Sequence, residues 1–193
     1  YYTARSSDGA WKQPEMLPNS NGYYDQADIL VSPDGTVLAV INWTYTEEKS
    51  LFYERSPGGQ WTRLAVSTPS TEIILDQDVA GSLYVFYTEN SSLLVLIRDP
   101  QKVWGTPRVI SPSYSSTFGA DVAGDGTIHL GYTNPEGPSN EYRRCSRDLT
   151  CDEPEMLTGG SGYILHLVAA ADGSAHIATT RTCLLYTSDA ADE

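Results

Sequence analysis

The chain has 193 residues, with 12 lysines and arginines against 25 aspartates and glutamates, and its formal net charge at pH 7 is −13. Nucleic acids and anionic membranes are bound through basic surfaces, so this charge argues against both as partners. Hydrophobic residues make up 40% of the chain, and 16 glycines and 11 prolines interrupt it, which excludes a disordered chain and a helical bundle. No apolar run approaches the ~20 residues of a membrane-spanning helix.

Two kinds of segment alternate along the chain. A hairpin-like segment contains a tryptophan at Trp11, Trp61 and Trp104, and Cys151 takes the fourth place. A second segment contains a glycine turn that recurs every 45 to 47 residues, at Gly35, Gly81, Gly126 and Gly173. Because two independent markers give one period, the chain is predicted to be built from structural repeats.

Each repeat contains four short β-rich runs separated by Gly, Pro, Asp and Ser. In the second repeat the predicted strands are 27–31, 36–43, 50–55 and 60–66. No segment has the pattern of a helix. Four strands in a period of ~40 to 50 residues are typical of a β-propeller blade, which buries its apolar faces against neighbouring blades.

The predicted fold is therefore an all-β, partial β-propeller of four-stranded antiparallel blades. The expected pieces, with sixteen strands in all, are half a blade at 1–20, three blades at 21–67, 68–112 and 113–158, and half a blade at 159–182. Sixteen strands would also close a four-bladed ring. We favour an open piece of a larger ring of six or seven blades.

The last eleven residues, 183–193, break this pattern. Their sequence, CLLYTSDAADE, resembles the translation of a transposase-type sequencing adapter. We interpret them as an artefact outside the fold and the chain as a truncated fragment of a longer protein. A genuine acidic tail is the alternative.

An arginine precedes each tryptophan of the repeat by six residues. The pairs are Arg5 with Trp11, Arg55 with Trp61, and Arg98 with Trp104, whereas Cys145 precedes Cys151 in the fourth copy. The exchange of one pair for another suggests that the two positions face each other across a turn. We expect an arginine over an indole in three copies and a disulfide in the fourth, with two free buried thiols as the alternative. A disulfide implies an oxidising, extracytoplasmic compartment, secreted or at the cell surface.

Two tripeptides fit the sequon for asparagine-linked glycans, Asn42-Trp43-Thr44 and Asn90-Ser91-Ser92. Patterns this short are often fortuitous. They bear on the protein only in a secretory route that attaches such glycans.

Three aspartates, Asp28, Asp78 and Asp121, each follow a repeat tryptophan by 17 residues, near the predicted innermost strand of a blade. Innermost strands line the channel of a propeller. These carboxylates are therefore candidates for binding sugar hydroxyls or a hard cation such as Ca²⁺. The alternative is structural, with each Asp accepting backbone N–H groups of the neighbouring blade.

The turn before each tryptophan resembles the Asp-box, or bacterial neuraminidase repeat, of sialidase-like propellers, written S-x-D-x-G-x-x-W. The segment 6–11 is a shortened version, 56–61 lacks the Asp, and 99–104 keeps the position and the Trp. In the family the box is a structural turn. The resemblance therefore implies the fold and not catalysis.

The resemblance also implies where a sialidase site would lie. Sialidases use three arginines, a Tyr nucleophile with a Glu, and an Asp acid/base, and the first arginine belongs to an Arg-Ile-Pro motif that this sequence lacks. Tyr142, Arg143 and Arg144 are adjacent, and neighbouring strand residues point to opposite faces. We assign no catalytic residue and no metal or cofactor, and no Cys/His spacing indicates zinc. His129 and His176 share a position with Leu38 and Tyr84, which favours a packing role.

The predicted function is a non-catalytic binding or scaffolding module, with a glycan or another cell-surface ligand as partner. The alternative is a fragment of a sialidase-type glycoside hydrolase whose catalytic blades are missing. A third possibility is a purely structural repeat of a large surface protein.

Overall fold

The computed structural model describes residues 1–18, 26–42, 50–65, 68, 70, 72–112, 117–134, 139–157, 164–170 and 172–179. These residues contain no helix, and therefore no helix long and apolar enough to cross a membrane. The chain divides into two compact units, Tyr1–Pro112 and Ser113–Glu193. The adapter-like segment 183–193 lies outside the described residues.

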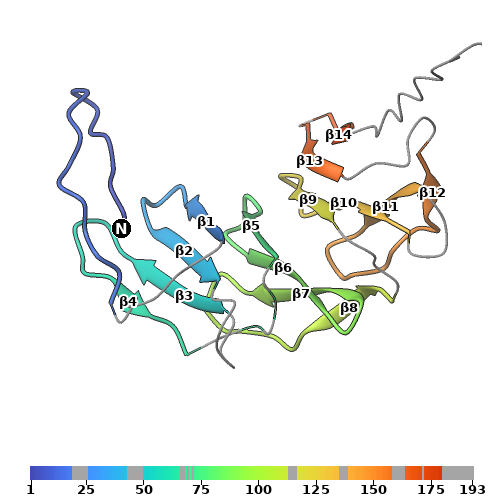
Figure 1. The fold of residues 1–193 in the computed structure, drawn as a ribbon, viewed down its shortest axis with the longest axis horizontal. Coiled ribbons are helices and arrows are strands. Elements are labelled where there is room, and N and C mark those ends of the chain that lie inside the picture. Colours follow the sequence, from blue (N-terminus) through green and yellow to red (C-terminus); the bar gives the residue numbers. More distant parts are fainter. Residues whose placement is uncertain are drawn as a thin grey trace, which may run out of the picture. The chain divides into compact units, whose positions relative to one another are not determined.

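The first unit contains two four-stranded antiparallel sheets, each formed by strands that are consecutive in the sequence (Figure 1). The first sheet consists of β1 (Gln26–Val31), β2 (Val37–Asn42), β3 (Ser50–Arg55) and β4 (Thr62–Arg63). The second consists of β5 (Ile73–Gln77), β6 (Leu83–Glu89), β7 (Ser92–Arg98) and β8 (Arg108–Ser111).

The second unit repeats this arrangement. One four-stranded sheet contains β9 (Phe118–Val122), β10 (Ile128–Thr133), β11 (Asn140–Cys145) and β12 (Glu155–Met156). A two-stranded sheet contains β13 (Ile164–Ala169) and β14 (Ala175–Thr179). The prediction of an all-β fold made of four-stranded antiparallel sheets is confirmed.

The first eighteen residues form a hairpin through two isolated antiparallel bridges, Tyr2 with Glu15 and Arg5 with Trp11. The sequence predicts two full strands here. Within the described residues the structure has fourteen strands plus these bridges, rather than sixteen strands.

The core of the first unit lies on both faces of the sheet β1–β4, and β2 shows why. Leu38 and Val40 pack in one cluster with residues of β5, β6 and β7. Val37, Ala39 and Ile41 point to the opposite face and pack with the N-terminal hairpin. Because side chains alternate between faces, a strand covered on both sides needs a continuous apolar run. Every residue of β2 is accordingly buried.

The turns between the first two strands of each sheet depend on a glycine with positive φ. Gly35, Gly81, Gly126 and Gly173 have φ values from 80° to 89°, a region that side chains with a Cβ disfavour. In three of these turns the residue directly before the glycine is an aspartate that accepts a backbone N–H. Asp34 binds Thr36 N at 2.8 Å, Asp125 binds Thr127 N at 2.9 Å, and Asp172 binds Ser174 N at 2.9 Å.

Candidate binding site

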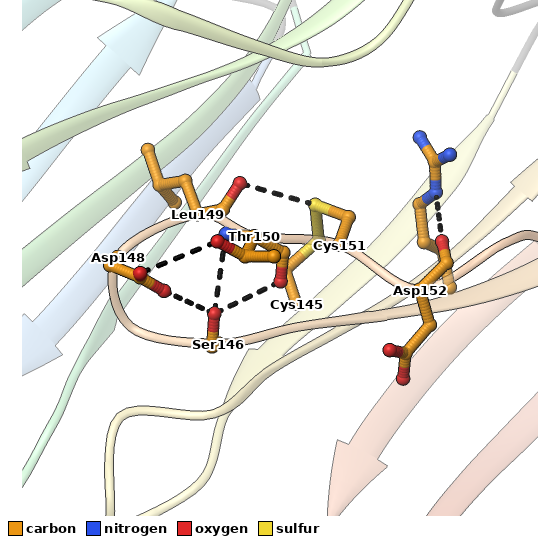
Figure 2. The surroundings of a disulfide bond; sticks show 8 residues. Cys145, Ser146, Asp148, Leu149, Thr150, Cys151 and Asp152 are labelled. Atoms are coloured by element: carbon orange, nitrogen blue, oxygen red, sulfur yellow. Dashed lines mark hydrogen bonds between the residues drawn. A yellow bond between two sulfur atoms is a disulfide. The ribbon is translucent and has the colours of Figure 1, made fainter.

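The turn between β11 and β12 is closed by a serine, an aspartate and a disulfide (Figure 2). Ser146 Oγ donates to an oxygen of Asp148, and Thr150 N donates to Ser146 Oγ at 3.2 Å. Cys145 and Cys151 are a bridge pair and form a disulfide with an S–S distance of 2.03 Å. The Ser-x-Asp geometry therefore fixes the turn from within while the disulfide joins its two ends.

The N-terminal hairpin contains the same Ser-x-Asp turn without the disulfide. Ser6 Oγ donates to Asp8, whose Oδ1 also accepts Ala10 N at 3.1 Å. The side chain of Arg5 folds back so that its Nε donates to Gly9 O at 3.0 Å, and Trp11 is 69% exposed. Arg5 and Trp11 are thus paired through the backbone across the turn.

The turn between β7 and β8 has the expected arginine over its indole. The guanidinium carbon of Arg98 lies 5.3 Å from the centroid of Trp104. Arg98 Nη1 also donates to Glu54 Oε2 at 2.6 Å, and Lys102 Nζ donates to Glu54 Oε1 at 2.6 Å. Burial alone would raise the pKa of Glu54, but these two cationic donors outweigh it and lower that pKa. The ion pair joins the two sheets of the first unit.

Arg55 and Trp61 depart from the expected pairing. The guanidinium of Arg55 lies 5.5 Å from the ring centroid of Tyr2, and its Nη2 binds Glu15 Oε1 at 3.1 Å. Trp61 is 92% buried and packs edge-on against Tyr2, with the ring centroids 5.0 Å apart. Both side chains therefore join the sheet β1–β4 to the N-terminal hairpin.

Two of the three candidate aspartates bind the next sheet of their own unit. Asp28 Oδ2, on β1, accepts Leu75 N of β5 at 2.8 Å. Asp121 Oδ2, on β9, accepts Ala169 N of β13 at 2.5 Å. Each carboxylate fills the role that the structural alternative gave it, because it satisfies a backbone donor of the neighbouring innermost strand.

Asp78 lies in a different position, directly after β5. Its Oδ1 accepts Ser82 N at 2.8 Å and its Oδ2 accepts the hydroxyl of Tyr84 at 3.2 Å, so it caps its own hairpin turn. The equal spacing of 17 residues therefore does not give equal structural positions. The segment from the repeat tryptophan to the first strand of the next sheet differs in length from sheet to sheet.

The true counterpart of Asp121 in the sheet β5–β8 is Asp76, which the sequence reasoning missed. Asp76 lies opposite Tyr84, just as Asp121 lies opposite His129. The signal was available, because both aspartates stand five residues before their turn glycines, Gly81 and Gly126. The Ser146-x-Asp148 match to the first turn was missed in the same way.

His129 is the most buried histidine of the described residues, at 1% exposure. Its Nδ1 lies 2.8 Å from the hydroxyl of Tyr142, while its Nε2 is buried without a hydrogen-bond partner. Burial, and next the positive charge of Arg144, lower the pKa of His129. It is a packed side chain, as its position in the repeat predicts.

A cavity of about 250 Å³ opens beside three turns of the first unit. Its apolar lining includes Pro33, Pro100 and Val79, and Val79 is 82% exposed. Its polar lining includes Asp34, Gln77 and Lys102. Gln77 Nε2 donates to Gly81 O at 3.1 Å, but Gln77 Oε1 is buried without a partner. The cavity thus combines apolar carbon with charged groups.

Sites for drug-sized ligands measure ~300–1,000 Å³, so a cavity of this size suits a ligand of about one sugar ring. Among the described residues no group of three or more His, Cys, Asp or Glu is arranged to hold a metal ion. The aspartates proposed for Ca²⁺ are engaged with backbone donors, as described above.

The architecture is consistent with part of a β-propeller, and a solved structure with a related fold exists. No protein-family model and no curated protein matches the chain. The solved structure, described as NanB plus Optactamide, aligns with a TM-score of 0.63 at 16% identity and covers 92% of this chain. NanB is a bacterial sialidase, so this chain has a sialidase-like β-fold. The alignment covers 31% of the NanB chain, so this chain spans about a third of its length.

Proposed function

We propose that this chain is a binding or scaffolding module of an extracytoplasmic protein with a sialidase-like fold, and that its ligand is a glycan. The observation that carries the proposal is the cavity between the turns of the first unit. A sugar ring offers apolar C–H faces and hydroxyl donors together. Val79 and its proline neighbours suit the first, and the exposed carboxylate of Asp34 suits the second.

The repeated side chains support a non-catalytic role. Asp28 and Asp121 bind backbone donors, and Arg55 and Arg98 bind glutamates of neighbouring segments. These groups are used to hold the sheets together. The disulfide supports an oxidising compartment.

Titration of the full chain with methyl glycosides of sialic acid, galactose and N-acetylglucosamine, followed by NMR, tests the proposal. We expect one of the three to shift the amide signals of Val79 and Gly81. Asp34→Asn, which removes the carboxylate charge of the lining and keeps an oxygen for Thr36 N, should weaken that binding about three- to tenfold. Lys12→Gln, at an exposed residue of the N-terminal hairpin, is the matched control and should bind as the wild type does. If none of the glycosides shifts these amides, the cavity is not a sugar site.

The second candidate is a fragment of a sialidase-type glycoside hydrolase. It is favoured by the alignment, in which this chain matches less than a third of a whole sialidase. The two candidates differ in the longer gene. A hydrolase requires an Arg-Ile-Pro motif upstream and a Tyr/Glu pair downstream, and a binding module does not.

A further inference from the structure

We propose that the folded, secreted chain carries an asparagine-linked glycan on Asn90 and none on Asn42, the other sequon asparagine. The two sequons are equivalent in the sequence, but the structure separates them. Asn90 is exposed at the tip of the β6–β7 hairpin, whereas Asn42, at the end of β2, is 2% exposed. A glycan is bulky and strongly hydrated, so only an asparagine at the surface accommodates one in the folded chain.

The hairpin geometry presents Asn90 outward. Glu89 pairs with Ser92, which leaves Asn90 and Ser91 as a two-residue loop with φ values of 49° and 59°. Two positive φ values define a type I′ turn, where asparagine is favoured and serine is not. Turn chemistry therefore explains Asn90, but it leaves Ser91 unexplained, because glycine would suit that position better. The sequon requires only that the middle residue, here Ser91, is not proline and that a serine or threonine, here Ser92, follows it.

Asn42 is buried on the central strand of its sheet. It pairs with Gln26 on one side and with Ser50 on the other, so both flanks of its backbone are occupied. A chain modified at Asn42 could not close these pairings around the added sugar. Glycan at Asn42 is thus incompatible with the fold.

The chemistry needs a lipid-linked oligosaccharide as co-reactant. The carboxamide nitrogen of Asn90 forms a bond to the anomeric carbon of the sugar, and the bond from that carbon to the lipid pyrophosphate breaks. The lipid pyrophosphate leaves with the electron pair, and the amide releases one proton. The transferases for this step act in the secretory route, where the disulfide Cys145–Cys151 also forms.

The glycan would not cover the cavity proposed for ligand binding. Consecutive antiparallel strands place the β5–β6 and β7–β8 turns at one end of the sheet and the β6–β7 turn at the other. In this sheet the cavity is lined by the β5–β6 and β7–β8 turns, and in the first sheet by the β1–β2 turn. The proposals for Asn90 modification and for sugar binding are therefore independent, and the failure of one does not contradict the other.

The test is secretion of the full chain, behind a signal peptide, from a eukaryotic host. Secreted protein is then treated with an amidase that removes asparagine-linked glycans in ¹⁸O water, and the labelled aspartate is located by mass spectrometry. We expect label at position 90 alone. Asn90→Gln and Ser92→Ala should each abolish the glycan, and Ser92→Thr should retain it, which shows dependence on the sequon hydroxyl. Asn42→Gln should leave the glycan unchanged.

Translation in the presence of microsomes keeps the test decisive if the chain is not secreted, because transfer occurs on the emerging chain before folding is complete. An unmodified Asn90 in both the wild type and Ser92→Thr overturns the proposal. Secreted, folded protein that carries a glycan at Asn42 also overturns it.

Discussion

The β7–β8 turn and the β11–β12 turn have the same backbone but different side-chain chemistry. Lys102 and Leu149 occupy the left-handed position of each turn, both with a φ of 66°. The N–H groups of Asp99 and Ser146 each close their turn on the carbonyl four residues later, at 3.0 and 2.9 Å. Backbone hydrogen bonds therefore define this corner.

The link across the turn is what differs. Arg98 and Trp104 are in contact through a cation and a π face, whereas Cys145 and Cys151 share a covalent bond. Both pairs are antiparallel bridge partners, so each position points at the other. One pair can therefore replace the other without a change of backbone. The arginine does more than the cysteine, because it also reaches Glu54 in the neighbouring sheet.

The largest loss of folding stability is expected from Arg98→Met. It removes one of the two cations that bind Glu54, and both side chains of that pair are mostly buried, at 8% and 13% exposure. Loss of a hydrogen-bonded partner to a buried charge should lower the free energy of unfolding of the first unit by about 2–3 kcal/mol. Chemical denaturation measures it. Lys102→Met is the matched control, because Lys102 is 54% exposed and should cost under about 1 kcal/mol. Equal losses in the two variants would contradict the interpretation.

The double substitution Cys145→Ala with Cys151→Ala should lower the stability of the second unit somewhat less. A disulfide that closes so short a loop contributes about 2 kcal/mol through chain entropy. Hydrogen exchange of the β11 amides should speed up by the corresponding factor. Reductant should do the same to the wild type and leave the variant unchanged. A variant that still responds to reductant would show that the effect does not come from this bond.

The first sheet shows how much of the fold the sequence predicts. The expected strands 27–31, 36–43 and 50–55 correspond to β1, β2 and β3 within one residue at each end. Local patterns determine these strands, because turn residues bound them and each is a short run of β-rich residues. The fourth, expected at 60–66, has only the two residues of β4 in regular pairing.

Contacts between segments distant in the sequence could not be predicted in this way. Arg55 was expected over Trp61, six residues away, but it lies over Tyr2 of the N-terminal hairpin. A local spacing shows which residues are near the turn, whereas the neighbouring segment decides which ring the guanidinium contacts. The candidate aspartates show the same limit. The number of residues to the turn glycine identifies equivalent positions, whereas the number of residues from the tryptophan does not.

A smaller effect, on the pH dependence of the unfolding free energy, is expected from His129 of β10, because the equivalent strands have other residues at this position. His129 is buried where β2 has Leu38, and its pKa lies below the ordinary 6.5, first because of burial and then because of Arg144. Tyr142, Asp121 and Asp125 also face it, and the two carboxylates offset part of the effect. Because the pKa of His129 is lower in the folded chain, its contribution to the free energy of unfolding is complete above pH 6.5. That contribution is lost as the pH falls from 6.5 through the pKa of the folded chain.

His129→Leu should therefore flatten the dependence of unfolding free energy on pH between about 7.5 and 5. The slope is the quantity to compare, because the variant also leaves the Tyr142 hydroxyl without its ring partner, which changes the stability independently of the titration of His129. His176→Leu, at an exposed histidine of β14, is the control and should keep the wild-type slope. An unchanged slope in His129→Leu would mean that His129 is not the group that titrates.

The smallest effect is expected on the local stability of the two Ser-x-Asp turns in acid. The pKa of Asp8 lies below the ordinary 3.8, first because Ser6 donates to it and then because of Ala10 N. The pKa of Asp148 is lowered first by Ser146 and then by Thr150 N. Each carboxylate therefore stabilises its turn fully above pH 3.8 and loses that contribution as the pH falls through its lower folded value.

The disulfide should separate the two turns once both carboxylates are protonated. The β11–β12 turn keeps Cys145 joined to Cys151, whereas the first turn retains hydrogen bonds and has no covalent link. Amide exchange at Ala10 should therefore rise more than at Thr150 as the pH falls from about 5 to 2, after correction for the intrinsic rate. In the Cys145→Ala/Cys151→Ala background the two amides should respond alike. If they still differ, the serine and aspartate geometry, and not the covalent link, distinguishes the two corners.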